Sequence, residues 1–279
     1  NFPADTVVAK TVSYFSDKHD PASQRHLETQ LLHLLGDEWR AYNYVWNEDQ
    51  NDAFLQEDTA VERKLLIKDP SAEDGVRTQT WRHASRSECL LCHIWAAGTV
   101  HAFWPEQLSL NSLSKQAGVE NQLVRLSELG LFADPVPAIK PIASPHDESR
   151  TLEDRARSYL ALNCSTCHRP QGGGTANFNF DLTKSLEANN YIDALPAQGS
   201  FGIDQGRVVA PGEPYRSVLL YRALKSGRGH MPQFGSNVID HRGIQLLHDW
   251  IGSMQVKSND PSTLDRELRS LGQMDETSQ

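Results

Sequence analysis

A chain of 279 residues with 38% hydrophobic and 23% charged residues is long enough for one large domain or two modest ones. Its formal charge of −9 argues against nucleic acid as a partner, because proteins that bind phosphate backbones carry basic patches. Mean hydropathy is −0.53 and apolar runs stay well below the ~20 residues that cross a bilayer, so we expect no membrane span.

Residues 1 to about 86 have the pattern of a β domain. Short β-branched and aromatic segments at 6–15, 27–35, 39–46, 63–68 and 77–83 are expected to be strands. Gly, Asp, Asn and Pro lie between them and suit turns. We therefore predict an antiparallel sheet at the start of the chain.

Residues 87–132 change to helical spacing of Leu and Val, which predicts helices over 88–95, 105–116 and 119–131. A Pro-rich stretch over 135–145 cannot form a regular helix and is expected to be a linker. The sequence thus predicts an α+β chain with one domain over 1–147 and a second over 148–279.

The second domain is expected to be helical. Helices are predicted over 152–162, 215–225 and 240–254, and the last of these places Ile244, Leu247, Trp250 and Ile251 on one face. The tail from residue 257 is polar and expected to be mobile.

All four cysteines fall in two copies of the motif Cys-x-x-Cys-His, whose spacing is typical of covalent c-type haem attachment. Two thiols one helical turn apart can each form a thioether to one porphyrin, and the following histidine becomes the proximal iron ligand. We therefore predict two haem c groups. The residues predicted to bind them are Cys89, Cys92 and His93 for haem 1, and Cys164, Cys167 and His168 for haem 2.

The same cysteines allow other interpretations. Two Cys-x-x-Cys pairs can form a four-cysteine zinc site, two small disulfides or a redox pair. None of these requires a histidine directly after the second cysteine, whereas one follows in both copies here. We therefore favour haem.

The second half of the chain resembles a class I c-type cytochrome. The resemblance lies in the attachment motif at 164–168, a Pro-Gly-x-Pro turn at 211–214 and a His-Met-Pro turn at 230–232 ahead of a final helix. It implies an all-α class I cytochrome c domain with Met231 as the sixth ligand of haem 2. A thioether is a soft, neutral donor that favours ferrous iron, which suits this role.

His230 is the neighbouring alternative to Met231. Of the other methionines, Met254 is expected in the core or at a helix end, and Met274 lies in the tail.

The first motif has no methionine at a suitable distance within residues 94–148. Candidate sixth ligands of haem 1 are His83, six residues before Cys89, and His101, eight residues after His93. Either is equally compatible with an ordinary surface histidine. Further candidates are His19, His26 and His33 in the β region.

Four further stretches carry a second resemblance, at 2–7, 27–32, 42–48 and 85–93. Through them, most of the chain resembles a family of exported bacterial dihaem proteins. It departs from that family's pattern at Gln30, where arginine is expected, and at Ala84, where proline is expected. Members occur alone or fused behind β-propeller sugar-dehydrogenase-like or β-helix domains. The resemblance implies an exported haem protein and says little about its reaction. If this chain shares the fusion habit, it would accept electrons from a dehydrogenase.

Haem attachment to this motif takes place outside the cytoplasm, so we expect a periplasmic or extracellular chain whose signal peptide has been removed. The favoured hypothesis is an electron carrier between a donor, such as a fused or docked dehydrogenase, and an acceptor. The alternative is a dihaem peroxidase- or oxidase-like enzyme with catalysis at haem 1, although such enzymes separate their motifs further. A third hypothesis is a structural haem module docked on a larger partner.

Overall fold

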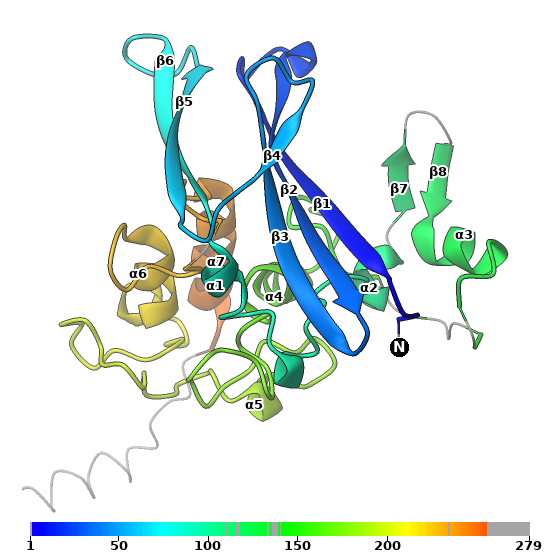
Figure 1. Ribbon diagram of the computed structural model, residues 1–279. Helices are drawn as coiled ribbons and strands as arrows, with labels where there is room; N and C mark the ends of the chain where they lie inside the picture. The colour runs from blue at the N-terminus through cyan, green and yellow to red at the C-terminus, as the bar shows by residue number, and fades with distance from the viewer. Residues whose placement is uncertain are drawn as a thin grey trace, which may run out of the picture.

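The computed structural model describes residues 2–109, 111–114, 118–132, 134, 135, 139, 141–233 and 235–255. Antiparallel strands form the N-terminal part, and the rest consists of helices joined by long connections, with one further short hairpin, β7–β8 (Figure 1). The predicted mixed α+β class is therefore confirmed. The tail from residue 256, with Met274, lies outside the described residues.

The first sheet is an antiparallel meander in the order β1-β2-β3-β4. Its strands are β1 (Val7–Phe15), β2 (Gln24–Leu35), β3 (Glu38–Trp46) and β4 (Ala53–Leu55). Leu35 pairs with Glu38 across a two-residue connection in which Gly36 has φ 60°. A positive φ at this place suits the turns whose twist matches that of a hairpin, which explains the glycine.

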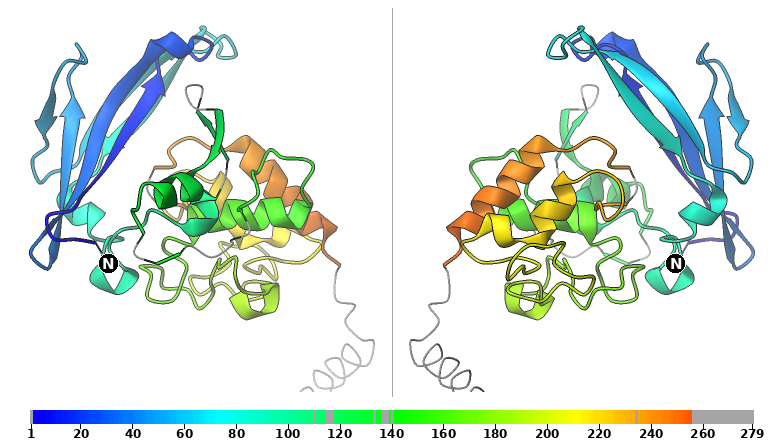
Figure 2. Two further views of the ribbon diagram at one scale, coloured as in Figure 1. Left: turned by 90° about the vertical axis from the view of Figure 1, so that its right-hand side faces the viewer. Right: turned by 90° about the vertical axis from the view of Figure 1, so that its left-hand side faces the viewer.

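A separate hairpin, β5 (Val61–Lys68) and β6 (Val76–His83), packs against the meander. Leu27 of β2 is buried with Leu65 and Ile67 of β5, so the two sheets share a small apolar core. Each predicted strand coincides with an observed one, and within residues 1–86 the three-residue β4 was missed. Together the strands form a layer beside the helical part (Figure 2).

The segment after the strands is less helical than predicted. The elements are α1 (Arg86–Cys89), η2 (Trp95–Ala97), α2 (Pro105–Leu108), β7 (Asn111–Ser114), β8 (Gly118–Asn121) and α3 (Gln122–Glu128). The predicted helices over 88–95 and 105–116 are wrong beyond their first turns, and that over 119–131 begins late. Asn and Ser favour caps and turns over helix interiors, and Asn121 caps α3 by accepting from the Val124 amide.

The second half contains α4 (Leu152–Cys164), α5 (Leu186–Asn189), η3 (Pro214–Arg216), α6 (Val218–Leu224) and α7 (His241–Ser253). The helices predicted over 152–162 and 240–254 are confirmed, and that over 215–225 is present but shorter. Among the described residues, no helix has the length and apolar composition needed to cross a membrane.

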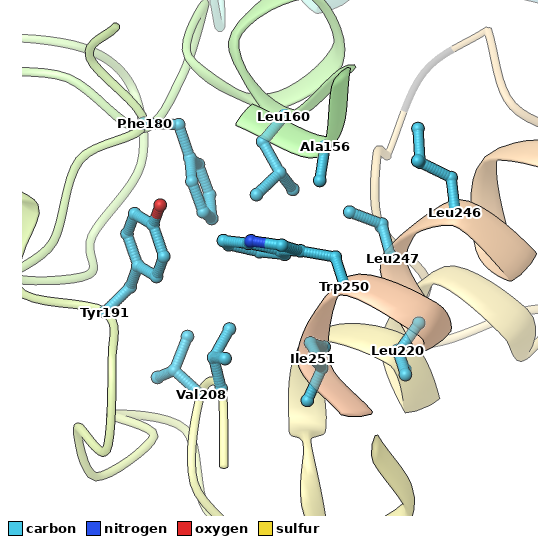
Figure 3. Packing of buried hydrophobic residues seen from close by; sticks show 11 residues of the cluster. Ala156, Leu160, Phe180, Tyr191, Val208, Leu220, Leu246, Leu247, Trp250 and Ile251 are labelled. Carbon is cyan, nitrogen blue, oxygen red and sulfur yellow. The ribbon is translucent and has the colours of Figure 1, made fainter. Parts of the chain in front are cut away.

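The main core lies between α4 and α7. Trp250 is only 2% exposed and packs among Leu160, Phe180 and Tyr191 (Figure 3). Burial of each such side chain stabilises the fold by about 1.5–3 kcal/mol. Gly243 allows the close approach of the helices, since a Cβ there would lie 2.3 Å from the Tyr159 hydroxyl oxygen.

The end of the Pro-rich stretch packs onto this core. Ile142 and Ala143 are buried, and the Ala143 amide donates to Ser158 Oγ on α4 at 2.9 Å. The Ile142 amide donates to the Glu106 carbonyl on α2. These contacts hold the first motif's segment close to α4, which carries the second motif.

Candidate functional site

The first Cys-x-x-Cys-His motif begins on α1, which is fixed against the meander. Ser85 and Glu88 form a capping box at the start of α1, so this single turn has its free amides satisfied. The Arg86 guanidinium donates to the Ala41 carbonyl at 3.1 Å and stacks over Tyr42 at 5.3 Å. Cys89 is therefore held beside β3.

The second motif begins at the last residue of α4. The His168 amide donates to the Cys164 carbonyl at 2.9 Å, which continues the helical turn through the motif. Three glycines follow, and their role is close packing: a Cβ on Gly172 would lie 2.3 Å from the Cys167 carbonyl oxygen. A Cβ on Gly174 would lie 3.1 Å from His168 Nδ1.

The fold brings the two motifs into direct contact. Cys92 Sγ lies 3.7 Å from Cys167 Sγ, although 75 residues separate them. Beside this contact, a Cβ on Gly173 would lie 2.9 Å from the Leu91 carbonyl oxygen, so glycine is needed for the backbones to meet. Two motifs that are predicted from sequence as separate sites therefore lie in one continuous region.

His101 and Arg169 join the motifs on one side. His101 Nε2 donates to the Cys92 carbonyl at 2.7 Å, and its Nδ1 accepts from Arg169, the residue after the second motif, at 2.8 Å. Burial lowers the pKa of His101, in keeping with a neutral ring. Both ring nitrogens are thus engaged in tying the two motifs together.

All four thiols are free. Burial raises the pKa of Cys164 to about 12, whereas the hydrogen bond from Cys92 lowers the pKa of Cys167 to about 7. Within the described residues, which include every cysteine, no three His, Cys, Asp or Glu side chains gather as a metal site. A four-cysteine zinc cluster is therefore not assembled here, and neither Cys-x-x-Cys pair is a disulfide.

The two predicted proximal histidines have different surroundings. His93 Nδ1 donates to the Thr99 carbonyl at 2.6 Å, an arrangement that leaves Nε2 available as a metal ligand. The His168 ring stacks on Phe178 at 4.9 Å between centroids, and its buried Nδ1 has no hydrogen-bond partner among the described residues. Burial, and then Arg222, lowers the pKa of His168, which favours the neutral form that binds metals.

Met231 belongs to a loop held against α6. Its amide donates to the Arg222 carbonyl at 3.0 Å, and Arg222 Nε donates to the Gly229 carbonyl. The positive charge of Arg222 also helps to lower the pKa of His168, so this loop lies on the side of the second motif. His230 Nε2 lies 2.8 Å from Ser236 Oγ, so one of its nitrogens is engaged within the loop.

His83 lies at the end of β6 and is 1% exposed. Its Nδ1 is 2.5 Å from Glu28 Oε2, and Asn43 donates to the same oxygen at 3.0 Å. Burial of Glu28 opposes ionisation, but the hydrogen bonds from His83 and Asn43 outweigh it and lower the pKa of Glu28. The other candidate histidines of the β region are not part of this network. His26 Nδ1 forms a hydrogen bond with Ser13 Oγ, His19 is exposed, and His33 is half-buried on β2.

Several of these residues escaped the sequence analysis. Glu28, Thr99 and Arg169 contact candidate ligands or the motifs themselves, and none was singled out. An acid in the middle of a predicted strand was a signal for Glu28, because an acid that becomes buried needs a partner. Backbone acceptors such as the Thr99 carbonyl carry no sequence signal.

Comparison of the chain with known protein families, with functionally characterised proteins and with solved structures gave no match.

Proposed function

We propose that this chain is an exported dihaem c-type cytochrome that passes single electrons between a donor protein, such as a dehydrogenase, and an acceptor. Haem 1 attaches to Cys89 and Cys92 with His93 as proximal ligand. Haem 2 attaches to Cys164 and Cys167 with His168 as proximal ligand. Each bound haem supplies a one-electron iron couple, and the chain supplies attachment, ligands and spacing.

The contact between Cys92 and Cys167 carries this proposal. Both are the second cysteine of their motif, so the two haems would be attached at atoms only 3.7 Å apart. Electron exchange within one molecule requires the two redox groups to be neighbours. The glycines of 172–174 and the His101–Arg169 hydrogen bond maintain that neighbourhood.

We assign residues 148–279 to a class I cytochrome c-like domain with Met231 as the second ligand of haem 2. Support comes from helices α4, α6 and α7 around one core, and from the Met231 backbone tied to Arg222 beside His168. A methionine ligand stabilises ferrous iron and raises the potential, which suits an acceptor of electrons.

The proposed partners are redox proteins. The formal charge of −9 becomes more negative with haem propionates, so a basic patch on the donor or acceptor would steer the encounter. The proposed location is the periplasm or the cell exterior. Electron exchange that slows steeply with added salt would match this expectation.

The test is to produce the chain in a host that attaches haem c and to count haems by intact mass. Two covalent haems, both low-spin in electron paramagnetic resonance of the oxidised protein, are expected, with reversible one-electron reduction of each. The double variant Cys164→Ala with Cys167→Ala should carry one haem. A haem-free product would refute the proposal, and a high-spin haem with peroxide turnover would replace the carrier by the dihaem enzyme.

A further inference from the structure

One ring nitrogen of His83 is buried and makes no hydrogen bond to the described residues. Its Nε2 has no hydrogen-bond partner among the described residues, although the residue is 1% exposed. A buried polar atom is normally paired, so an unpaired one indicates a missing partner. Because Nδ1 is already used by Glu28, the missing partner belongs at Nε2.

The hydrogen-bond network around His83 holds the ring in one orientation. Glu28 Oε2 accepts hydrogen bonds from His83 Nδ1 and from the Asn43 side-chain amide. Glu28 Oε1 accepts one from the Gln30 side-chain amide at 2.6 Å. Glu28 is itself 1% exposed. A histidine that ligates a metal almost always donates its other nitrogen to a carboxylate or carbonyl, which fixes the tautomer.

This network adjoins the first motif. A small cavity is lined by Asn43 and Gln56 from the side of the network, and by Ala84 and Cys89 from the side of α1. Asn43 Nδ2 donates to Gln56 Oε1 at 2.9 Å, and Gln56 Nε2 donates to the His83 carbonyl at 3.3 Å, so the end of β6 and the cavity lining are joined by hydrogen bonds. Glu28 is also near enough to Cys89 to raise the pKa of that thiol, after the larger effect of burial.

His101, the other candidate, has both ring nitrogens occupied by the Cys92 carbonyl and Arg169. Ligation by His101 would break one of the hydrogen bonds that join the two motifs. Ligation by His83 breaks none, because its Nε2 is unpaired.

We infer that His83 Nε2 is the sixth ligand of haem 1, and that Glu28 is the positioning residue that holds His83 as that ligand. The inference rests on the proposed attachment of haem at Cys89 and Cys92. Haem 1 would then be held by two histidines, His83 and His93, and haem 2 by His168 and Met231. The two centres would then differ in potential, with haem 1 lower.

Near-infrared magnetic circular dichroism of the oxidised wild-type holoprotein tests the ligand pair directly, since bis-histidine and histidine–methionine haems have different charge-transfer bands. One band of each kind is expected. Two histidine–methionine bands, or a high-spin haem 1, would overturn the inference without touching covalent attachment. This measurement needs no variant, so a variant that fails to fold leaves the inference testable.

Variants then assign the histidine. His83→Gly should keep two haems by mass but convert one to high-spin, and added imidazole should restore the low-spin spectrum. His101→Gly is the matched control and should keep both haems low-spin. An unchanged spectrum in His83→Gly, or a high-spin haem in His101→Gly alone, would overturn the inference. A wild-type product with no haem at 89–93 would instead refute the proposed function, so the two failures are distinguishable.

Glu28→Gln tests the positioning role. The variant keeps the size of the side chain and removes its negative charge, so His83 becomes a weaker donor to ferric iron. One haem should remain low-spin with a raised reduction potential and shifted g values, and Glu28→Asp should restore part of the change. A merely structural role would lower stability and leave the potential and g values of the folded protein unchanged.

Discussion

The sulfur atoms of Cys92 and Cys167 lie 3.7 Å apart, and each belongs to a different copy of the same five-residue motif. The contact lies between the layer of strands and the helical part. The first motif begins on α1, which is anchored on β3, and the second motif begins at the last residue of α4. Because all four thiols are free, these two sulfurs can react with each other.

We expect the haem-free chain to form a disulfide between Cys92 and Cys167 under mild oxidation by glutathione disulfide. The sulfurs need to close from 3.7 Å to ~2.05 Å, a small movement for two turns that already touch. The pKa of Cys167 is lowered to about 7 by the hydrogen bond from Cys92, so its thiolate fraction rises steeply from pH 6 to 8. Peptide mapping at several pH values measures the yield and rate.

Cys164→Ser is the control, because the pKa of Cys164 is raised to about 12 and this thiol should contribute little. Cross-linking of the wild type between 164 and 167, with none between 92 and 167, would contradict the contact. In the proposed dihaem form both sulfurs would be thioethers, and the cross-link should be absent.

Gly173→Ala should separate the motifs. The new Cβ would lie 2.9 Å from the Leu91 carbonyl oxygen, which is backbone and cannot rotate away. We expect destabilisation of about 1–3 kcal/mol, as for overpacking elsewhere, and slower electron exchange between the haems. Urea unfolding of the holoprotein and pulse-reduction kinetics are the measurements.

Gly252→Ala on α7 is the matched control, since its Cβ would meet only Pro214 Cγ at an ordinary 3.7 Å. Alanine is favoured over glycine in a helix by about 0.5–1 kcal/mol, so this variant should be slightly more stable. Equal effects of the two substitutions would show that the Gly173–Leu91 approach is unimportant.

Local pattern was enough to predict the strands and the long helices. Alternation of β-branched and aromatic residues is a local property, and the burial of Leu247, Trp250 and Ile251 on one face of α7 follows from helical spacing. The short α2 and the β7–β8 hairpin were mispredicted because Asn and Ser side chains compete with the helical backbone over a few residues.

The arrangement of the candidate site required three-dimensional information. The motifs themselves can be read from sequence, but their contact depends on how α1 packs on β3 and on three glycines placed for close approach. The pairing of Glu28 with His83 spans 55 residues between two different sheets. Sequence spacing made His83 and His101 equally good candidates for the sixth ligand of haem 1. Their hydrogen bonds in the structure distinguish them.

Asp69 should control part of the acid stability of the strand layer. Its carboxylate accepts from the Ser71 side chain and amide and from Lys18, and these bonds lower its pKa from 3.8 to about 2. A lowered carboxyl pKa adds stability that is fully present above pH 3.8 and is lost as pH falls through about 2. Urea midpoints between pH 5 and 2 should fall less steeply for Asp69→Asn than for the wild type.

Asp49→Asn is the control for that series, because Asp49 is an exposed residue in the connection between β3 and β4. Its profile should follow that of the wild type. Parallel profiles for all three proteins would mean that the Asp69 hydrogen bonds are equally present in the unfolded chain.

Met231→Ala tests the second haem. Loss of the thioether should lower the potential of one haem and open its iron to added imidazole, because methionine ligation favours the ferrous state. Redox titration and imidazole binding measure both effects. Met254→Ala is the matched control: Met254 packs on the core at the end of α7, so truncation should cost about 1–2 kcal/mol of unfolding free energy and leave both potentials unchanged. If Met231→Ala left potentials and ligand binding as in the wild type, the ligand would have to be another side chain, and His230, whose Nδ1 is buried without a partner among the described residues, would be the next to substitute.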